Sequence, residues 1–393
     1  MVSKDYKNRH LQALFKNIYD FEFMTKRKYT FIALILVLVF SCKNDGSNES
    51  ERTIQLLSQD TITRMVVTMD NLRLRAAPGT NQEMVAELKQ GAELETTGAI
   101  SPLKTSQMIS GIEREEPWVE VKTDDGATGW IFGGGVKVEG AQNTPVASVL
   151  RKERLSSFFG PEKTRQILQY RTDFYSVENP RDFENVFIRG TILRDSLVET
   201  MGNKIEIFNH ENLPDLSWIE DAMPGFTSEM IAEGTRYYLF QDYGKMRVWA
   251  KSTSAEEDDA FFEFMTFVNA DEDLEGFYPV WFEQAWEHGG YSLLGEGKHL
   301  SVLTRMEKLM ETQKLFRNPN LKLKMKLLKD ILNSPTGAYG ASAEKITEEI
   351  DAIISADFKI LSKAEKANLA LRKKHFLEPA KFGLKLDLKP TNN

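Results

Sequence analysis

The sequence has almost no cysteine and little histidine, and both shortages restrict the chemistry open to it. Of 393 residues, one is cysteine (Cys42) and five are histidine. Papain-like peptidases need a thiolate beside a histidine, and zinc enzymes need several ligands at fixed spacing. No HExxH or HxxEH sequence occurs. If Cys42 serves as an anchor, as argued below, cysteine-based hydrolysis is excluded and no disulfide can stabilise the fold. No metal site is predicted.

An excess of positive charge is also missing. After residue 42, the chain holds 43 Lys and Arg against 55 Asp and Glu, a net charge of −12. Such a chain lacks the basic surface that nucleic-acid binding requires. Electrostatic binding of a polybasic segment to anionic lipid is not expected either. Apolar residues make up 41% of the sequence, with 24 Phe and 6 Trp. These residues are sufficient for folded cores in two or three domains.

A short apolar run near the N-terminus has the layout of an export signal. A basic cluster, Thr25–Lys28, precedes the run, and Ser41 and Cys42 close it. A membrane span needs about 20 apolar residues, whereas this run has about a dozen, which is typical of a signal peptide. The stretch Val39-Phe40-Ser41-Cys42 resembles a relaxed form of the lipobox of bacterial lipoproteins. In that family the cysteine takes a lipid and becomes the new N-terminus.

The lipobox resemblance implies where in the cell the protein is located. Residues 24–41 would be the signal peptide and residues 42–60 a polar tether. Lipid on Cys42 would hold the protein at a membrane of the bacterial cell envelope, facing the periplasm or the surface. Residues 1–23 do not fit a signal, so we interpret them as an upstream extension with Met24 as the true start. A chance cysteine is the alternative, but the sole cysteine falls where the signal requires one.

Residues 61–140 have the pattern of short strands separated by turns. Leu72-Arg73-Leu74-Arg75 alternates apolar and polar residues, as half-buried strands do. Asp125-Gly126 is a strong hairpin signal. The pattern resembles the bacterial SH3 (SH3b) family, a small β-barrel of envelope and cell-wall proteins. The stretches that carry the resemblance are residues 71–79, 85–92, 118–122 and 128–134.

The SH3b resemblance implies a module that binds peptide or cell-wall material without catalysis. Trp118 and Trp130 are the candidate ligand-binding residues, because exposed aromatic rings form ligand platforms. Both could instead be core residues, which we favour for Trp130 because Ile131 and Phe132 follow it. Two departures from the family are a polar loop over 98–116, longer than usual, and Gly135 where many relatives have an aromatic residue.

Residues 150–393 match no family that we can name and are predicted to be an α+β region, mainly helical from about residue 254. Strands are predicted over 204–208, 236–240, 246–250 and 381–389, the middle two as a hairpin around Gly244. Apolar residues at helical spacing predict the helices. These helices cover 149–170 with a break at Gly160-Pro161, the segment from about 254, 278–287, 302–316, 321–332, 343–354 and 364–376.

Candidate catalytic patterns in this region are weak. Ser342–Lys345 and Ser101–Lys104 match S-x-x-K, but the companion motifs are absent, and a helix cap and a barrel loop are favoured. The acidic stretch that begins at Asp271 has Phe282 where a calcium loop needs a bidentate Glu. The segment His288–His299 contains four glycines and is interpreted as a loop. No cofactor is predicted.

We therefore predict a membrane-anchored, non-catalytic envelope lipoprotein with several domains: a small all-β SH3-like barrel followed by an α+β, mainly helical region. The barrel would bind peptide, cell-wall material or a protein partner. The alternative is an enzyme of another family in the C-terminal region, positioned by the barrel. A deep pocket at residues 288–299 with convergent acids or histidines would favour the enzyme, and a closed core would favour the scaffold.

Overall fold

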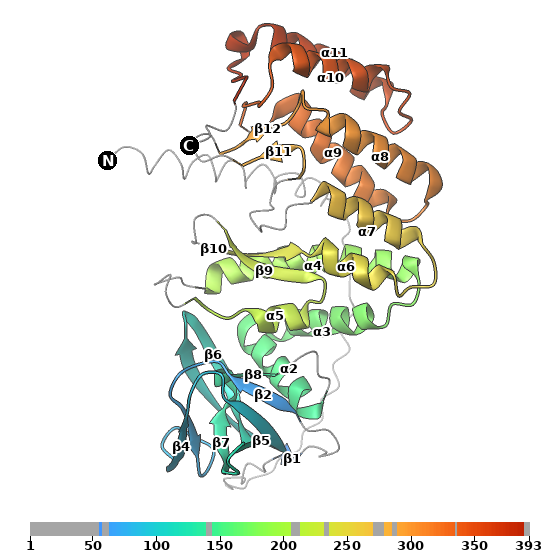
Figure 1. The fold of residues 1–393 in the computed structure, drawn as a ribbon. Helices are drawn as coiled ribbons and strands as arrows, with labels where there is room; N and C mark the ends of the chain where they lie inside the picture. Colours follow the sequence, from blue (N-terminus) through green and yellow to red (C-terminus); the bar gives the residue numbers. More distant parts are fainter. Residues whose placement is uncertain are drawn as a thin grey trace, which may run out of the picture. The chain divides into compact units, whose positions relative to one another are not determined.

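A computed structural model describes most of the chain beyond the N-terminal segment (Figure 1). The described residues are 55–56, 63–138, 144–205, 213–231, 236–269, 279–284, 289–334 and 336–388. The chain divides into two compact units, with the boundary between Thr266 and Phe267. The predicted signal peptide, most of the tether and the lipid site at Cys42 lie outside the described residues. Within the described ranges, no helix is both long and apolar enough to cross a membrane.

The first unit begins with an antiparallel sheet in the order β4-β3-β7-β6-β5-β2-β8, with β1 paired to β5. Its strands are β1 (Gln55–Leu56), β2 (Arg64–Val67), β3 (Leu72–Arg75), β4 (Met84–Leu88), β5 (Glu93–Ile109), β6 (Ile112–Thr123), β7 (Thr128–Phe132) and β8 (Val136–Val138). Alternation along the strands buries Leu74, Val119, Val121 and Ile131 completely. The predicted all-β SH3-like barrel is confirmed.

The polar loop predicted over 98–116 is wrong, because these residues form most of the longest hairpin in the barrel. Strands β5 and β6 stay paired out to Ile109 and Ile112, and Ser110-Gly111 turns the chain with positive φ at both residues. We call residues 104–117 the arm. Exposed and half-buried residues alternate along its first strand, but both kinds are mostly polar. Without an apolar face, the arm has no hydrophobic strand signal.

Helices then dominate the first unit. Its remaining elements are α2 (Pro145–Phe159), α3 (Pro161–Tyr175), α4 (Pro180–Lys204), α5 (Ser217–Ala222), β9 (Phe226–Ile231), β10 (Arg236–Gln241), α6 (Tyr243–Ala250) and α7 (Glu257–Val268). The first three helices begin with proline, whose missing N–H would have no partner there in any case. The predicted break at Gly160-Pro161 is confirmed, but helices prevail from Pro145, well before residue 254.

Of the three strands predicted in this region, 236–240 is confirmed as β10, 246–250 is wrong, and 204–208 is wrong in its described part. Strand β10 pairs with β9, which precedes it, and residues 246–250 belong to helix α6. The carboxylate of Asp242 accepts a hydrogen bond from the Lys245 N–H, and this N-cap turns the chain into a helix. Lys204 ends helix α4 and Ile205 is not in a strand; the rest of the predicted strand 204–208 lies outside the described residues.

Aromatic rings fill the core that these helices enclose. Phe183 of α4 lies 4.7 Å, between ring centroids, from Phe262 of α7 and 5.7 Å from Phe174 of α3. Phe187 lies 5.4 Å from Phe261, with its ring nearly perpendicular. Edge-to-face pairs of this kind stabilise a core beyond the area they bury.

The second unit is also mainly helical. Its elements after α7 are β11 (Phe282–Glu283), β12 (Tyr291–Ser292), α8 (Lys298–Thr312), α9 (Arg317–Asn333), α10 (Ala343–Ser355), α11 (Lys363–Leu377) and the 3-10 turn η3 (Pro379–Phe382). The last four predicted helices are confirmed with shifted ends. The helix predicted over 278–287 is wrong in its described part, where β11 pairs with β12. Turn η3 and a bridge between Ala338 and Lys385 replace the predicted terminal strand.

Candidate functional site

Both candidate tryptophans lie in the barrel core. Trp118 is 2% exposed and Trp130 is 6% exposed. The indole N–H of Trp118 donates to the Thr105 hydroxyl (2.8 Å), and its ring meets Phe132 edge to face at 6.3 Å. Neither ring has an exposed face, so both residues are core residues by position. Ligand binding by either one stays a prediction.

One side of the barrel is closed by a buried ion pair with helix α2. Glu116 of β6 is fully buried, and Arg154 of α2 is 8% exposed. The guanidinium donates to both carboxylate oxygens of Glu116 (2.8 and 2.9 Å) and to the carbonyls of Gly133 (2.8 Å) and Val136 (2.9 Å). A buried charge needs such complete pairing, because desolvation otherwise outweighs the attraction. Val146 and Leu150 of α2 also belong to the core of the barrel.

The glycines on this side leave no room for side chains. Residues Gly133–Gly135 form a buried 3-10 turn, η2. A Cβ on Gly133 would lie 2.8 Å from the Pro117 carbonyl oxygen, and one on Gly135 would lie 2.6 Å from Leu72. The family departure at Gly135 thus has a physical reason. The chain passes too close to Leu72 for an aromatic residue to fit.

The arm is held against the helices from several directions. Its Lys104 pairs with Glu153 of α2 (2.5 Å), and the Glu115 N–H donates to the Ser157 hydroxyl (3.0 Å). Arg114 is buried 5.6 Å from the Trp218 ring of α5 and donates to the Asp215 carbonyl. Burial, then the charge of Arg154, lowers the pKa of Arg114 to about 10 against the opposing effect of nearby carboxylates. Arg114 therefore stays charged at neutral pH.

The opposite edge of the barrel is open. Strand β4 ends the sheet and, among the described residues, is paired only with β3. Met84 is 52% exposed and Val85 is 48% exposed, because a β-bulge leaves Val85 between the register pairs Leu74–Ala86 and Arg75–Met84. Glu87 is also exposed, whereas Leu88 is buried. The outer part of β4 thus presents apolar side chains beside an unpaired strand edge.

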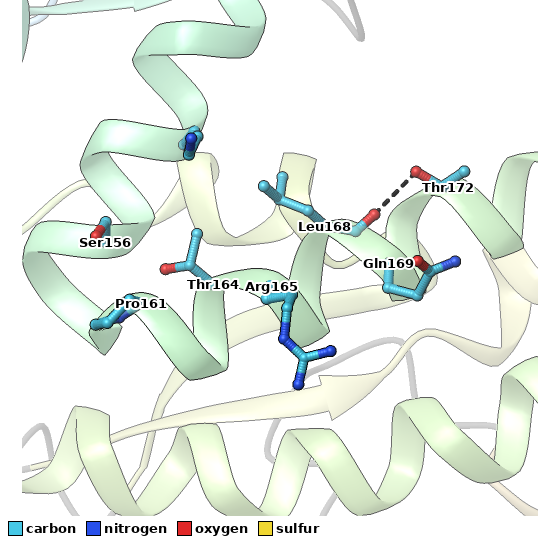
Figure 2. A pocket seen from close by; sticks show the side chains of 8 residues that line it. Ser156, Pro161, Thr164, Arg165, Leu168, Gln169 and Thr172 are labelled. Carbon is cyan, nitrogen blue, oxygen red and sulfur yellow. Dashed lines mark hydrogen bonds between the residues drawn. The ribbon is translucent and has the colours of Figure 1, made fainter. Parts of the chain in front are cut away.

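A groove between α2 and α3 has a volume of about 460 Å³, but it has no convergent chemistry (Figure 2). The Thr164 hydroxyl donates to the Gly160 carbonyl, and the Thr172 hydroxyl donates to that of Leu168, one turn earlier in the same helix. Arg165 pairs with Glu162 of the same helix. The polar groups serve their own helix, so we do not treat the groove as a site.

The described part of the glycine-rich segment is held by a carboxylate of the second unit. Glu349 of α10 accepts hydrogen bonds from the N–H groups of Gly295 (2.6 Å), Gly297 (3.0 Å) and Leu300 (2.9 Å). A carboxylate at this helix start satisfies N–H groups that have no partner within the helix. Lys298 begins α8 directly afterwards. The carboxylate therefore fixes the backbone of this segment. The loop prediction is confirmed for residues 293–297 and is wrong where Tyr291–Ser292 form β12 and Lys298 begins α8.

Two polar side chains of this segment meet Asp330 of α9 without forming a catalytic triad. His299 Nε2 lies 2.8 Å from Asp330 Oδ2, and the Ser292 hydroxyl donates to the same oxygen at 2.5 Å. A nucleophilic serine would have to contact the histidine instead. Ser292 and His299 are fully buried. In the described part of the chain, no cluster of three or more His, Cys, Asp or Glu could hold a metal ion.

Comparison with known proteins identifies the barrel. A family model described as the bacterial SH3 domain matches residues 70–137. This part of the chain is a bacterial SH3 domain, as the resemblance implied, and it lies within the predicted bounds 61–140. No curated protein and no solved structure matches the chain. The sequence interpretation missed the Arg154–Glu116 pair and the open edge at Met84 and Val85. Two adjacent apolar residues where a strand should alternate were the available signal for that edge.

Proposed function

We propose that the protein is an envelope lipoprotein whose SH3 domain binds an extended peptide along strand β4. Strand addition to an exposed sheet edge is a common mode of peptide recognition, in which main-chain hydrogen bonds give affinity and side chains give specificity. The observation that carries the proposal is the exposure of Met84 and Val85 on an edge strand.

An apolar open edge is otherwise a liability. Soluble proteins protect such edges with charge, proline or a covering segment, because an unpaired strand recruits other chains. Here the apolar pair lies at the start of β4, and the charged Glu87 follows two residues after Val85. A peptide that pairs with β4 and covers both apolar side chains accounts for this arrangement. The sheet also ends at β8, but there Arg154 of α2 already donates to the Val136 carbonyl.

A labelled peptide tests this proposal in the full chain. The probe is a fluorescent heptapeptide that alternates valine and threonine, measured by fluorescence polarisation, with purified cell-wall sacculi as a second probe. Changing Met84→Lys together with Val85→Lys should weaken peptide binding at least 10-fold, because two apolar contacts are replaced by charge. The matched control is Val248→Lys with Met325→Lys, two exposed apolar residues elsewhere. Equal loss in both double variants would overturn the proposal.

The proposed attachment to the membrane through lipid on Cys42 needs a separate test. The proposed lipid on Cys42 follows from the export-signal pattern, and the tether would place the SH3 domain close to the bilayer. Cys42→Ala should abolish metabolic labelling with a fatty acid and release the protein from the membrane fraction. Unchanged labelling would end the anchor proposal and leave peptide binding at β4 unaffected.

A further inference from the structure

A second hollow lies between the arm and the helices of the first unit, and no residue of β4 lines it. Its volume is about 420 Å³, within the range of small-molecule sites. Strands of the arm form one wall, and the C-terminal ends of α2 and α4 form the other. The lining residues are Ser106, Glu113, Glu115, Ser157, Phe158 and Lys204.

The arm wall is anionic. Glu113 and Glu115 are two residues apart in β6, so their side chains lie on the same face of the hairpin. Ser106 is the register partner of Glu115, and its hydroxyl donates to Glu113 Oε1 at 2.8 Å. Both glutamates are exposed. Two carboxylates therefore face solvent from this wall of the cleft.

The helix wall carries one cation. Lys204, the last residue of α4, donates from its ammonium to the Phe158 carbonyl of α2 (2.6 Å). The same ammonium lies 5.6 Å from the centroid of the Phe158 ring. A carbonyl from the last turn of one helix and an aromatic face both favour a positive charge. They hold Lys204 on its own wall, apart from the glutamates, with which it forms no ion pair in the described structure.

We propose that this cleft binds a zwitterion, a free amino acid or a short peptide with both ends unblocked. The ammonium group of the ligand would pair with Glu113 and Glu115, and its carboxylate with Lys204. A ligand with one sign of charge would meet a like charge on one of the two walls, whereas a zwitterion meets the opposite charge on both. Charge-assisted hydrogen bonds of this kind are stronger than neutral ones.

This site is independent of peptide addition at β4, and the experiment separates the two. Calorimetric titration of the full chain uses the dipeptide alanyl-alanine, its N-acetylated form and its C-terminal amide. Free alanine is titrated in parallel, so that a single amino acid and a peptide are distinguished as sources of the same end groups. The unblocked dipeptide should bind, and each blocked form should bind roughly 10-fold to 100-fold more weakly.

Charge-removing variants assign each end of the ligand to its wall. Glu113→Gln with Glu115→Gln should abolish the preference for a free ammonium, and Lys204→Gln should abolish that for a free carboxylate. Matched controls are Glu93→Gln on β5 and Lys122→Gln on β6, both exposed and outside the cleft. Thermal unfolding confirms that each variant is folded. Equal binding of free and blocked dipeptides, or no binding at about 10 mM, would overturn the proposal.

Discussion

The side of the SH3 domain next to α2 and its β4 edge differ in how their polar groups are used. Near α2, Arg154 satisfies Glu116 and two barrel carbonyls, and the arm is fixed to α2 by further polar contacts. Among the described residues, β4 pairs only with β3, and two of its apolar side chains are exposed. The difference leaves one side of the barrel occupied by structural contacts and the other available for the proposed peptide.

The largest expected effect is the loss of the buried ion pair. Arg154→Met leaves the buried Glu116 carboxylate with only its 3.9 Å contact to Arg114, which should lower the free energy of unfolding by about 3–5 kcal/mol. Urea unfolding of the full chain, followed by tryptophan fluorescence, measures the change. Combining Arg154→Met with Glu116→Leu removes both charges and should restore part of the loss. A single variant as stable as the parent would show that the contact with α2 does not depend on this pair.

A smaller effect is expected from filling the glycine turn. In Gly133→Ala the new methyl group would lie 2.8 Å from the Pro117 carbonyl and 3.1 Å from Leu150. Overpacking at such a site costs about 1–3 kcal/mol, measured as a shift of the urea midpoint. An unchanged midpoint would mean that α2 can move away from the barrel at little cost.

The exposed ion pair of the arm should matter less. Lys104→Met removes the contact with Glu153, and the two side chains are 41% and 24% exposed. Exposed pairs contribute roughly 0.2–1 kcal/mol, and salt screens them. Thermal unfolding at low and high salt should show the difference from the parent shrinking as salt rises. A loss of stability as large as that of Arg154→Met would mean that the Lys104–Glu153 pair is the main contact that holds the arm on α2.

The smallest effect on stability is expected at the open edge. Met84→Ala shortens a side chain that is already 52% exposed, so the free energy of unfolding should change by less than about 0.5 kcal/mol. Peptide binding at β4 should weaken in the same variant. A large loss of stability would mean that Met84 packs in the barrel and does not serve a ligand, and the contrast between the two sides would fail.

The parts that could be predicted from sequence are those with a local pattern. In β3, Leu72 and Leu74 alternate with polar residues. Asp125-Gly126 forms the predicted turn between β6 and β7. The helix that starts after Ser342 has the predicted cap. The side chain of Ser342 accepts a hydrogen bond from the Lys345 N–H as predicted. Each of these features depends on residues within a few positions of one another.

The parts that could not be predicted depend on distant partners. Strand β10 has β9 before it and a capped helix after it, and its own residues favour neither neighbour as its partner. The arm is polar on both faces. Its two strands are held together by backbone pairing with each other and by contacts with α2, neither of which the local sequence indicates. Arg154 and Glu116 are 38 residues apart, and no sequence pattern joins them. The cleft beside the arm forms only because the C-terminal ends of α2 and α4, far apart in the sequence, both lie against the arm.

The participation of α2 in the barrel core determines how this SH3 domain could be transplanted. A cassette cut at the family boundary, residues 70–137, would lose strand β2 with the core residues Met65 and Val67. It would also lose Val146 and Leu150 from its interior and separate Glu116 from Arg154. A graft that runs from Arg64 at the start of β2 through Phe159 at the end of α2 restores all of these residues. The smallest portable form of the domain is therefore a barrel with its own helical lid, and engineers should move the two together.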